Sequence, residues 1–137
     1  MHTSAHLRRA VELLEQHGLN TDDRNFVAPN GALDICAALY QGATCVLPEA
    51  FRADADAALD LIKASTWAMT AIRAVYDTLG PEVTMPGDGP DEVIDRVSHW
   101  AATAPNRASQ PPTRTEVMGR LLRTADALDQ KATELAA

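Results

Sequence analysis

The sequence predicts an all-α fold, a compact bundle of five or six helices with no significant sheet. Alanine, the residue with the highest helix propensity, supplies much of the 46% hydrophobic content, while aromatic residues make up only 4%. Apolar residues recur at helical spacing in several segments, and no stretch alternates apolar and polar residues as a strand would. Low aromatic and β-branched content also disfavours a β-sandwich.

The first predicted helix ends at Gly18, a residue that readily adopts the left-handed conformation of a helix terminus. Thr3 or Ser4 is expected to cap its beginning, because their hydroxyls accept hydrogen bonds from first-turn amides. Its apolar stripe recurs at i, i+3, i+4 and i+7 and consists of Leu7, Ala10, Val11 and Leu14.

The second predicted helix begins at Asn30 as its cap and runs to about Gln41, where Gly42 ends it. Apolar residues cover much of its circumference, which predicts the most buried helix of the bundle. Residues 19–30 before it are mostly polar and are expected to form a loop, in which Phe26 and Val27 pack inward or form a short extended piece.

The segment from Arg52 to Leu79 has the strongest helical pattern, because one apolar stripe keeps its phase throughout. We therefore expect one long helix, with a kink near Ser65. Two helices joined by a tight turn at Ser65 are the alternative, because serine and threonine are also capping residues. Gly80-Pro81 ends the segment.

Two further helices are predicted after a loop over residues 81–89. One begins at Pro90, which suits the first helical position, and ends before Pro105. The last follows Thr113 and Glu116, whose spacing is that of a capping box.

The 137 residues are expected to form a single helical domain, frayed at residues 1–3 and at about 133–137. A net charge of −7 disfavours nucleic acid as a partner, because such binding depends on Lys and Arg contacts with phosphates. The N-terminus lacks the apolar region of a signal peptide, and no apolar run is long enough for a membrane span. We expect a soluble, cytoplasmic protein with reduced thiols.

No motif for a cofactor or a metal is found, so neither is expected. Cys36 lies in the most apolar helix, and His99 is the histidine with which it would form a thiolate–imidazole pair. We expect Cys36 to be a small core residue instead. Cys45 is expected to pack in a connector, and a reducing compartment disfavours a disulfide between the two.

His2 and His6 lie four residues apart and would share one face of a helix, a spacing that can hold zinc together with a third ligand. We favour a solvated His6 in the first helical turn. The acidic residues around the start of the long helix are interpreted as a solvated first turn rather than an acid–base or cation site. They are Glu49, Asp54, Asp56 and Asp60.

Two groups of residues are candidates for binding. The scarce aromatic residues and the two reactive side chains are candidates for one pocket or interface: Tyr40, Trp67, His99, Trp100 and Cys36. Three arginines make the last helix locally basic and are a candidate docking face: Arg114, Arg120 and Arg123. Without a partner, these arginines are expected to form a solvated face.

The chain resembles a family of small actinobacterial proteins of unknown function. The segments that carry the resemblance are His6–Gly18, Gly31–Leu39, the helix with Trp100, and Pro112–Val117. Many members of that family have Trp-Asn-Asp where this chain has Trp100-Ala101-Ala102, so a polar site there would be altered. The resemblance implies no activity, because the family is uncharacterised.

Amphipathic helices without a catalytic motif favour a non-enzymatic protein that acts through protein–protein interaction, including self-association as a homodimer. The alternative is a small helical enzyme or small-molecule-binding protein with an interhelical pocket near Trp100. A nucleic-acid regulator that uses the Arg114–Arg123 helix is the weakest hypothesis, because of the negative charge.

Overall fold

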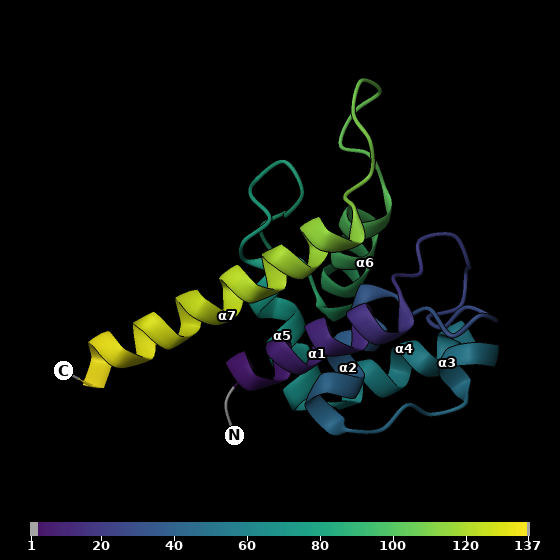
Figure 1. Ribbon diagram of the computed structural model, residues 1–137, viewed down its shortest axis with the longest axis horizontal. Coiled ribbons are helices and arrows are strands. Elements are labelled where there is room, and N and C mark those ends of the chain that lie inside the picture. Colours follow the sequence, from purple (N-terminus) through teal and green to yellow (C-terminus); the bar gives the residue numbers. More distant parts are fainter. Residues whose placement is uncertain (1–2, 137) are drawn as a thin grey trace.

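Residues 3–136 are described by a computed structural model, in which they form seven helices and no strand (Figure 1). The helices are α1 (Thr3–His17), α2 (Ile35–Thr44), α3 (Ala50–Ala53), α4 (Ala55–Ala64), α5 (Thr66–Tyr76), α6 (Pro90–Ala102) and α7 (Arg114–Ala136). The predicted all-α fold is confirmed. The count exceeds five or six because the segment from residue 50 to 76 holds three helices.

Helix α2 forms the centre of the core and packs against α1, α5 and α6. Eight of its ten residues are buried, so the prediction that it is the most buried helix is confirmed. Gly42 allows α1 and α2 to approach closely, because a Cβ there would lie 2.6 Å from the carbonyl oxygen of His6. This close contact explains why Gly42 lies inside α2, whereas the sequence predicts that it ends the helix. The helix ends instead at Cys45, which has a left-handed φ of 65°.

The predicted start of α2, with Asn30 as its cap, is wrong by four residues. Asp34 is the N-cap, and its carboxylate accepts a hydrogen bond from the amide of Cys36. The carboxamide oxygen of Asn30 instead accepts from the amide of Ala32 within a turn. Residues 32–34 stay extended because Leu33 pairs through its backbone with Gly18 and Asn20.

The loop before α2 folds back on itself and follows the prediction in part. Val27 is buried and pairs in an isolated bridge with Leu33, so this part packs inward as expected. The amide of Val27 also donates to the carbonyl oxygen of Phe51, which joins the loop to α3.

The prediction of one long helix over residues 52–79 is wrong, and the two-helix alternative is correct. Ser65 leaves the helical conformation, and its hydroxyl accepts from the amide of Ala68 to cap α5. Asp54 caps α4 in the same way, through the amide of Ala57. The apolar residues of the predicted stripe are still buried on both sides of the break: Ala58, Ile62, Met69, Ile72 and Leu79.

Helices α1 and α6 begin and end close to where the sequence predicts. Pro90 starts α6. Gly18 ends α1 with a φ of 92°, and α1 begins at Thr3, so Thr3 and Ser4 lie in its first turn and are not its cap. The predicted fraying of residues 1–3 is wrong for Thr3, which is helical, and residues 1 and 2 lie outside the described residues.

The predicted capping box of α7 is present, with reciprocal hydrogen bonds between Thr113 and Glu116 of 2.9 and 3.1 Å. Helix α7 continues to Ala136, beyond the predicted fraying near residue 133. It packs along α1 and then extends past the N-terminal end of α1, away from the other helices (Figure 1). Within the described part of the chain, no helix has the length and apolar character needed to cross a membrane.

Candidate functional site

The five residues proposed for one pocket or interface do not come together. Cys36 and Tyr40 are buried on α2, where the Tyr40 ring lies 4.8 Å from that of Phe51. Trp67 is 55% exposed on α5, while His99 and Trp100 are neighbours on α6. Sequence spacing could not show that these residues lie apart. It indicates which residues share a face of one helix, but not which faces of different helices meet.

Cys36 is a core residue, as the sequence predicts. Its thiol is fully buried, lies 3.6 Å from the carbonyl oxygen of Ile94, and is 3.3 Å from the hydroxyl of Ser98. Burial raises the thiol pKa well above its ordinary value, and the nearby Asp34 carboxylate adds to this effect. The thiolate needed by a nucleophile is therefore disfavoured, and the imidazole of His99 lies instead 3.4 Å from the Thr103 hydroxyl.

Two local predictions about reactive side chains are wrong. Cys45 is exposed rather than packed, because its cap conformation ends α2 at the surface, where the Arg9 guanidinium contacts its sulfur. His6 is buried rather than solvated, and its ring lies 5.9 Å from that of Trp67. Burial, and then the nearby Arg9 charge, lower the pKa of His6. Both cysteines are free, and His2 lies outside the described residues.

The three arginines proposed as a docking face differ in their surroundings. Arg120 is partly buried, donates to the carbonyl oxygen of Thr78 at 2.9 Å, and has its guanidinium carbon 5.4 Å from the centre of the Trp100 ring. Arg114 and Arg123 are exposed on α7. Arg120 therefore stabilises the packing of α7 near α6, and two arginines remain as an exposed basic pair.

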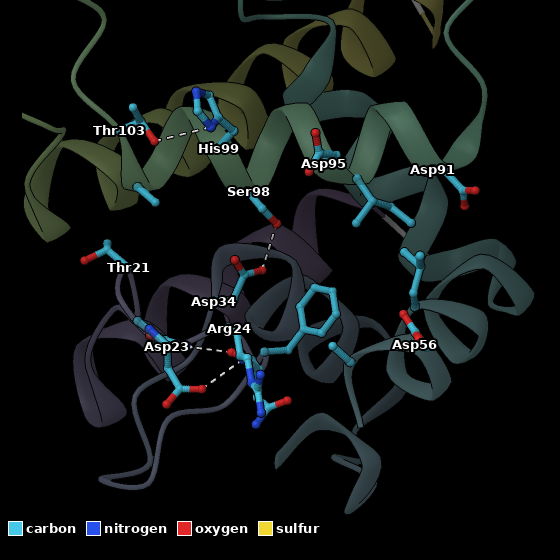
Figure 2. Close-up of a pocket in the computed structure, with 17 residues that line it drawn as sticks. Thr21, Asp23, Arg24, Asp34, Asp56, Asp91, Asp95, Ser98, His99 and Thr103 are labelled. Carbon is cyan, nitrogen blue, oxygen red and sulfur yellow. Dashed lines mark hydrogen bonds between the residues drawn. The ribbon is translucent and has the colours of Figure 1, made fainter. Parts of the chain in front are cut away.

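A cleft of about 370 Å³ lies beneath α6, between that helix, α4 and the loop that follows α1 (Figure 2). Asp34 forms part of its floor. One oxygen of this carboxylate accepts hydrogen bonds from the amide of Cys36 at 2.7 Å and from the hydroxyl of Ser98 at 3.1 Å. Figure 2 shows Asp34 between the loop and α6, directly below Ser98.

The carboxylate of Asp34 has the most perturbed acid–base equilibrium in the cleft. Burial raises its pKa from 3.8 to about 6, while the hydrogen bonds from Cys36 and Ser98 act in the opposite direction. The group is therefore mostly ionised at neutral pH, with an unusually high tendency to take up a proton.

The near wall of the cleft is a loop organised by the side chain of Asn20. This buried carboxamide donates to the carbonyl oxygen of Asn25 at 2.8 Å and accepts from the amides of Asp22 and Asp23 at 3.3 and 3.0 Å. These bonds hold the loop in a tight turn. Asp23 and Arg24 are thereby placed at the rim of the cleft (Figure 2).

The far wall of the cleft is one face of α6. Helical spacing places Asp91, Asp95 and Ser98 along this face, and Asp56 of α4 lies across from them (Figure 2). Asp91 forms an ion pair with Lys63 at 2.9 Å. The ionisable groups among the lining residues are five aspartates, one arginine and one histidine: Asp23, Asp34, Asp56, Asp91, Asp95, Arg24 and His99.

A second cavity, of about 520 Å³, lies on the other side of α6 and is called here the Trp100 groove. Its apolar walls are formed by five residues, which are Val83, Trp100, Ala104, Pro105 and Pro112. Arg96 also lines it, but its guanidinium pairs with Asp88 at 2.7 Å, and Asp88 accepts a further hydrogen bond from Tyr76. The positive charge of Arg96 is therefore largely neutralised within the protein.

Among residues 3–136, no three His, Cys, Asp or Glu side chains are close enough together to hold a metal ion. The aspartates of the cleft instead surround a space large enough for a group of several atoms. They create a negative potential that attracts cations, and a low-dielectric floor strengthens it at Asp34.

Several residues of this cleft were not identified from the sequence, above all Asp34, Asn20 and Ser98. One signal pointed to Asp34, since an aspartate directly before the apolar run from Ile35 to Leu39 is typical of an N-cap. No local signal joins the loop near Asn20 to α6, because they meet only in the folded chain.

No protein-family model, curated protein or solved structure matches the chain. The resemblance to an actinobacterial family therefore stays a prediction.

Proposed function

We propose that this protein binds a small organic cation, a primary amine or a guanidinium group, in the cleft beneath α6. The observation that supports it is the Asp34 carboxylate, which lies on the floor of an open cleft with four further aspartates around it. Ammonium and guanidinium groups form charge-assisted hydrogen bonds with carboxylates. A guanidinium also matches two carboxylate oxygens at once, which favours it over a spherical ion.

Calorimetric titration with methylguanidinium and propylamine tests the proposal, and urea is the neutral control of the same shape as guanidinium. We expect both cations to bind and urea not to bind. Asp34→Asn keeps the acceptor that caps α2 and removes the charge, so it should weaken cation binding at least about tenfold. Asp77→Asn makes the same charge change at an exposed residue outside the cleft and should leave binding unchanged.

Two results would contradict the proposal: cation binding that survives Asp34→Asn, or equal weakening by Asp77→Asn. The pH dependence is a further check. Affinity should fall as the pH drops below about 6, because protonation removes the charge of Asp34.

A second candidate function is self-association through α7. Leucines recur every seventh residue on this helix, at 121, 128 and 135, and their exposure rises along it until Leu135 is 79% exposed. A stripe of this period suits a helix–helix contact between two copies. Light scattering at high micromolar concentration should show a dimer, and a clean monomer would count against self-association.

A further inference from the structure

We infer that the cation bound beneath α6 is the basic side chain of an extended peptide, which crosses α6 and places an apolar residue in the Trp100 groove. This inference rests on the proposed cation site and names the kind of partner that would occupy it. It follows from the positions of the two cavities, the width of the helix between them and their charges.

The two cavities lie on opposite sides of one helix. Ser98 faces the cleft and Trp100 faces the groove, and residues two apart on an α-helix point about 200° apart. Three residues line both cavities and form what is called here the α6 ridge: Asp95, His99 and Thr103. A ligand that occupies both cavities therefore passes over this ridge.

The width of the helix favours an extended chain as the ligand. An α-helix with its side chains is about 10–12 Å across, a distance that three or four extended residues cover at about 3.3 Å each. The α6 ridge is exposed and presents a carboxylate, an imidazole and a hydroxyl. These groups can form hydrogen bonds with the amides and carbonyls of a peptide backbone.

The charges along this path favour a basic partner. The cleft has five aspartates, one of which is Asp95 on the α6 ridge, and Glu82 lines the groove. The positive charge of Arg96 in the groove is offset by Asp88. Although Arg24 lines the cleft and Lys63 pairs with Asp91, carboxylates outnumber the positive charges along the path of a peptide with an arginine or lysine for the cleft.

The groove itself is suited to an apolar side chain. Trp100, Val83 and two prolines provide rigid apolar surface, and a space of about 520 Å³ can hold an aromatic ring or a large aliphatic group. Prolines keep such a wall in place because their backbone has little freedom.

Capped peptides in which alanines separate one arginine from one phenylalanine, in both chain directions, test this inference. Calorimetry gives the affinity of each peptide for the protein, which is compared with the affinity of the same peptide with alanine in place of phenylalanine. We expect phenylalanine to increase affinity about tenfold when about three residues intervene, and little with none or with six. Trp100→Ala should remove this gain and leave the affinity of the alanine peptide unchanged.

A spectroscopic signal places the peptide at the groove. The chain has two tryptophans, so Trp67→Phe leaves Trp100 as its sole indole emitter. Phenylalanine peptides should shift the emission of Trp100 to shorter wavelength, and alanine peptides should not. Trp67 is 55% exposed and lines neither cavity, and phenylalanine keeps an aromatic ring beside His6.

The outcomes separate the two proposals. If methylguanidinium and the alanine peptides bind in an Asp34-dependent manner, but phenylalanine adds nothing or its gain survives Trp100→Ala, the peptide inference is wrong and the cation site stands. If no cation binds, both are wrong.

Discussion

The carboxylate of Asp34 caps α2 and at the same time forms the floor of the cleft. A cap needs only an acceptor, and asparagine serves this purpose as well as aspartate. The negative charge is therefore not required by the helix. It has an energetic cost, since burial makes the ionised form less favourable than in an unfolded chain. A charge that the cap does not need is consistent with a role in binding.

The cost of this charge predicts how stability depends on pH. The folded pKa of Asp34 is about 6 and its ordinary value is 3.8, so the folded state holds the proton more tightly. Its contribution to stability is fully present below about pH 4 and is lost as the pH rises through about 6. Relative to Asp34→Asn, the wild type should therefore lose up to about 3 kcal/mol between pH 4 and pH 7.

Urea denaturation of both proteins across this pH range measures the difference. Taking the difference cancels the titration of all other groups. A difference that is constant with pH would show that the pKa of Asp34 is not raised by folding.

At the residue scale, sequence reasoning identified roles that local chemistry determines. It interpreted Cys36 as a core residue and recognised the capping box of Thr113 and Glu116. The prediction of a solvated His6 was wrong, because its ring lies beside Trp67 of α5, a helix that is far away in the sequence. The capping role of Asp34 and the loop hydrogen bonds of Asn20 are local, but the contact of Asp34 with Ser98 of α6 is not, so the sequence does not indicate the cleft.

At the element scale, the division between α4 and α5 shows how a correct pattern led to a wrong boundary. The apolar phase continues across Ser65 because both helices bury their apolar residues in the same core. A continuous phase therefore predicts burial correctly and does not distinguish one helix from two. The hydrogen bond from the Ala68 amide to the Ser65 hydroxyl stabilises two helices over one, because it satisfies an amide that the break leaves without a partner in the helix.

The close contact between α1 and α2 predicts that alanine at Gly42 lowers the free energy of unfolding, whereas alanine at Gly119 of α7 raises it. At Gly42 an added Cβ would lie 2.6 Å from a backbone oxygen of α1, so the helices must separate. Overpacking of this kind outweighs the higher helix propensity of alanine, and Gly42→Ala should destabilise the protein by about 1–3 kcal/mol.

Gly119→Ala is the matched control within α7. Its Cβ would lie 3.2 Å from the end of the Arg123 side chain, which can move away. Alanine should stabilise the protein here by up to about 1 kcal/mol. Thermal denaturation of both variants checks the pair, and a stable Gly42→Ala protein would mean that α1 and α2 are not in close contact there.

At the scale of the whole molecule, composition and periodicity were sufficient for the fold class. They could not predict that α6 has a cavity on each side, because both cavities also depend on loops. The loop after α1 forms a wall of the cleft, and residues 82–83, 104–105 and 112 contribute to the groove. Loop conformation depends on tertiary contacts, such as the backbone hydrogen bonds from Asn20 to Leu33 and from Val27 to Phe51, which no periodic pattern predicts.

The end of α7 that projects from the bundle is expected to contribute to self-association but not to the stability of the monomer. Residues 131–136 are exposed, whereas Asp126 and Asp129 pair with Arg8 at 2.6 and 3.0 Å and tie α7 to α1. Removing residues 131–137 should therefore change the free energy of unfolding by no more than about 0.5 kcal/mol. The same truncation removes Leu135 and should convert a dimer into a monomer.

Leu121→Ala is the contrasting variant, because this leucine belongs to the same series of every seventh residue but is fully buried in the core. It should lower the free energy of unfolding by about 2–5 kcal/mol. Urea denaturation at a concentration where light scattering shows a monomer keeps association out of the measured stability. A truncated protein that is strongly destabilised as a monomer would show that the end of α7 supports its own chain, and self-association would then need another surface.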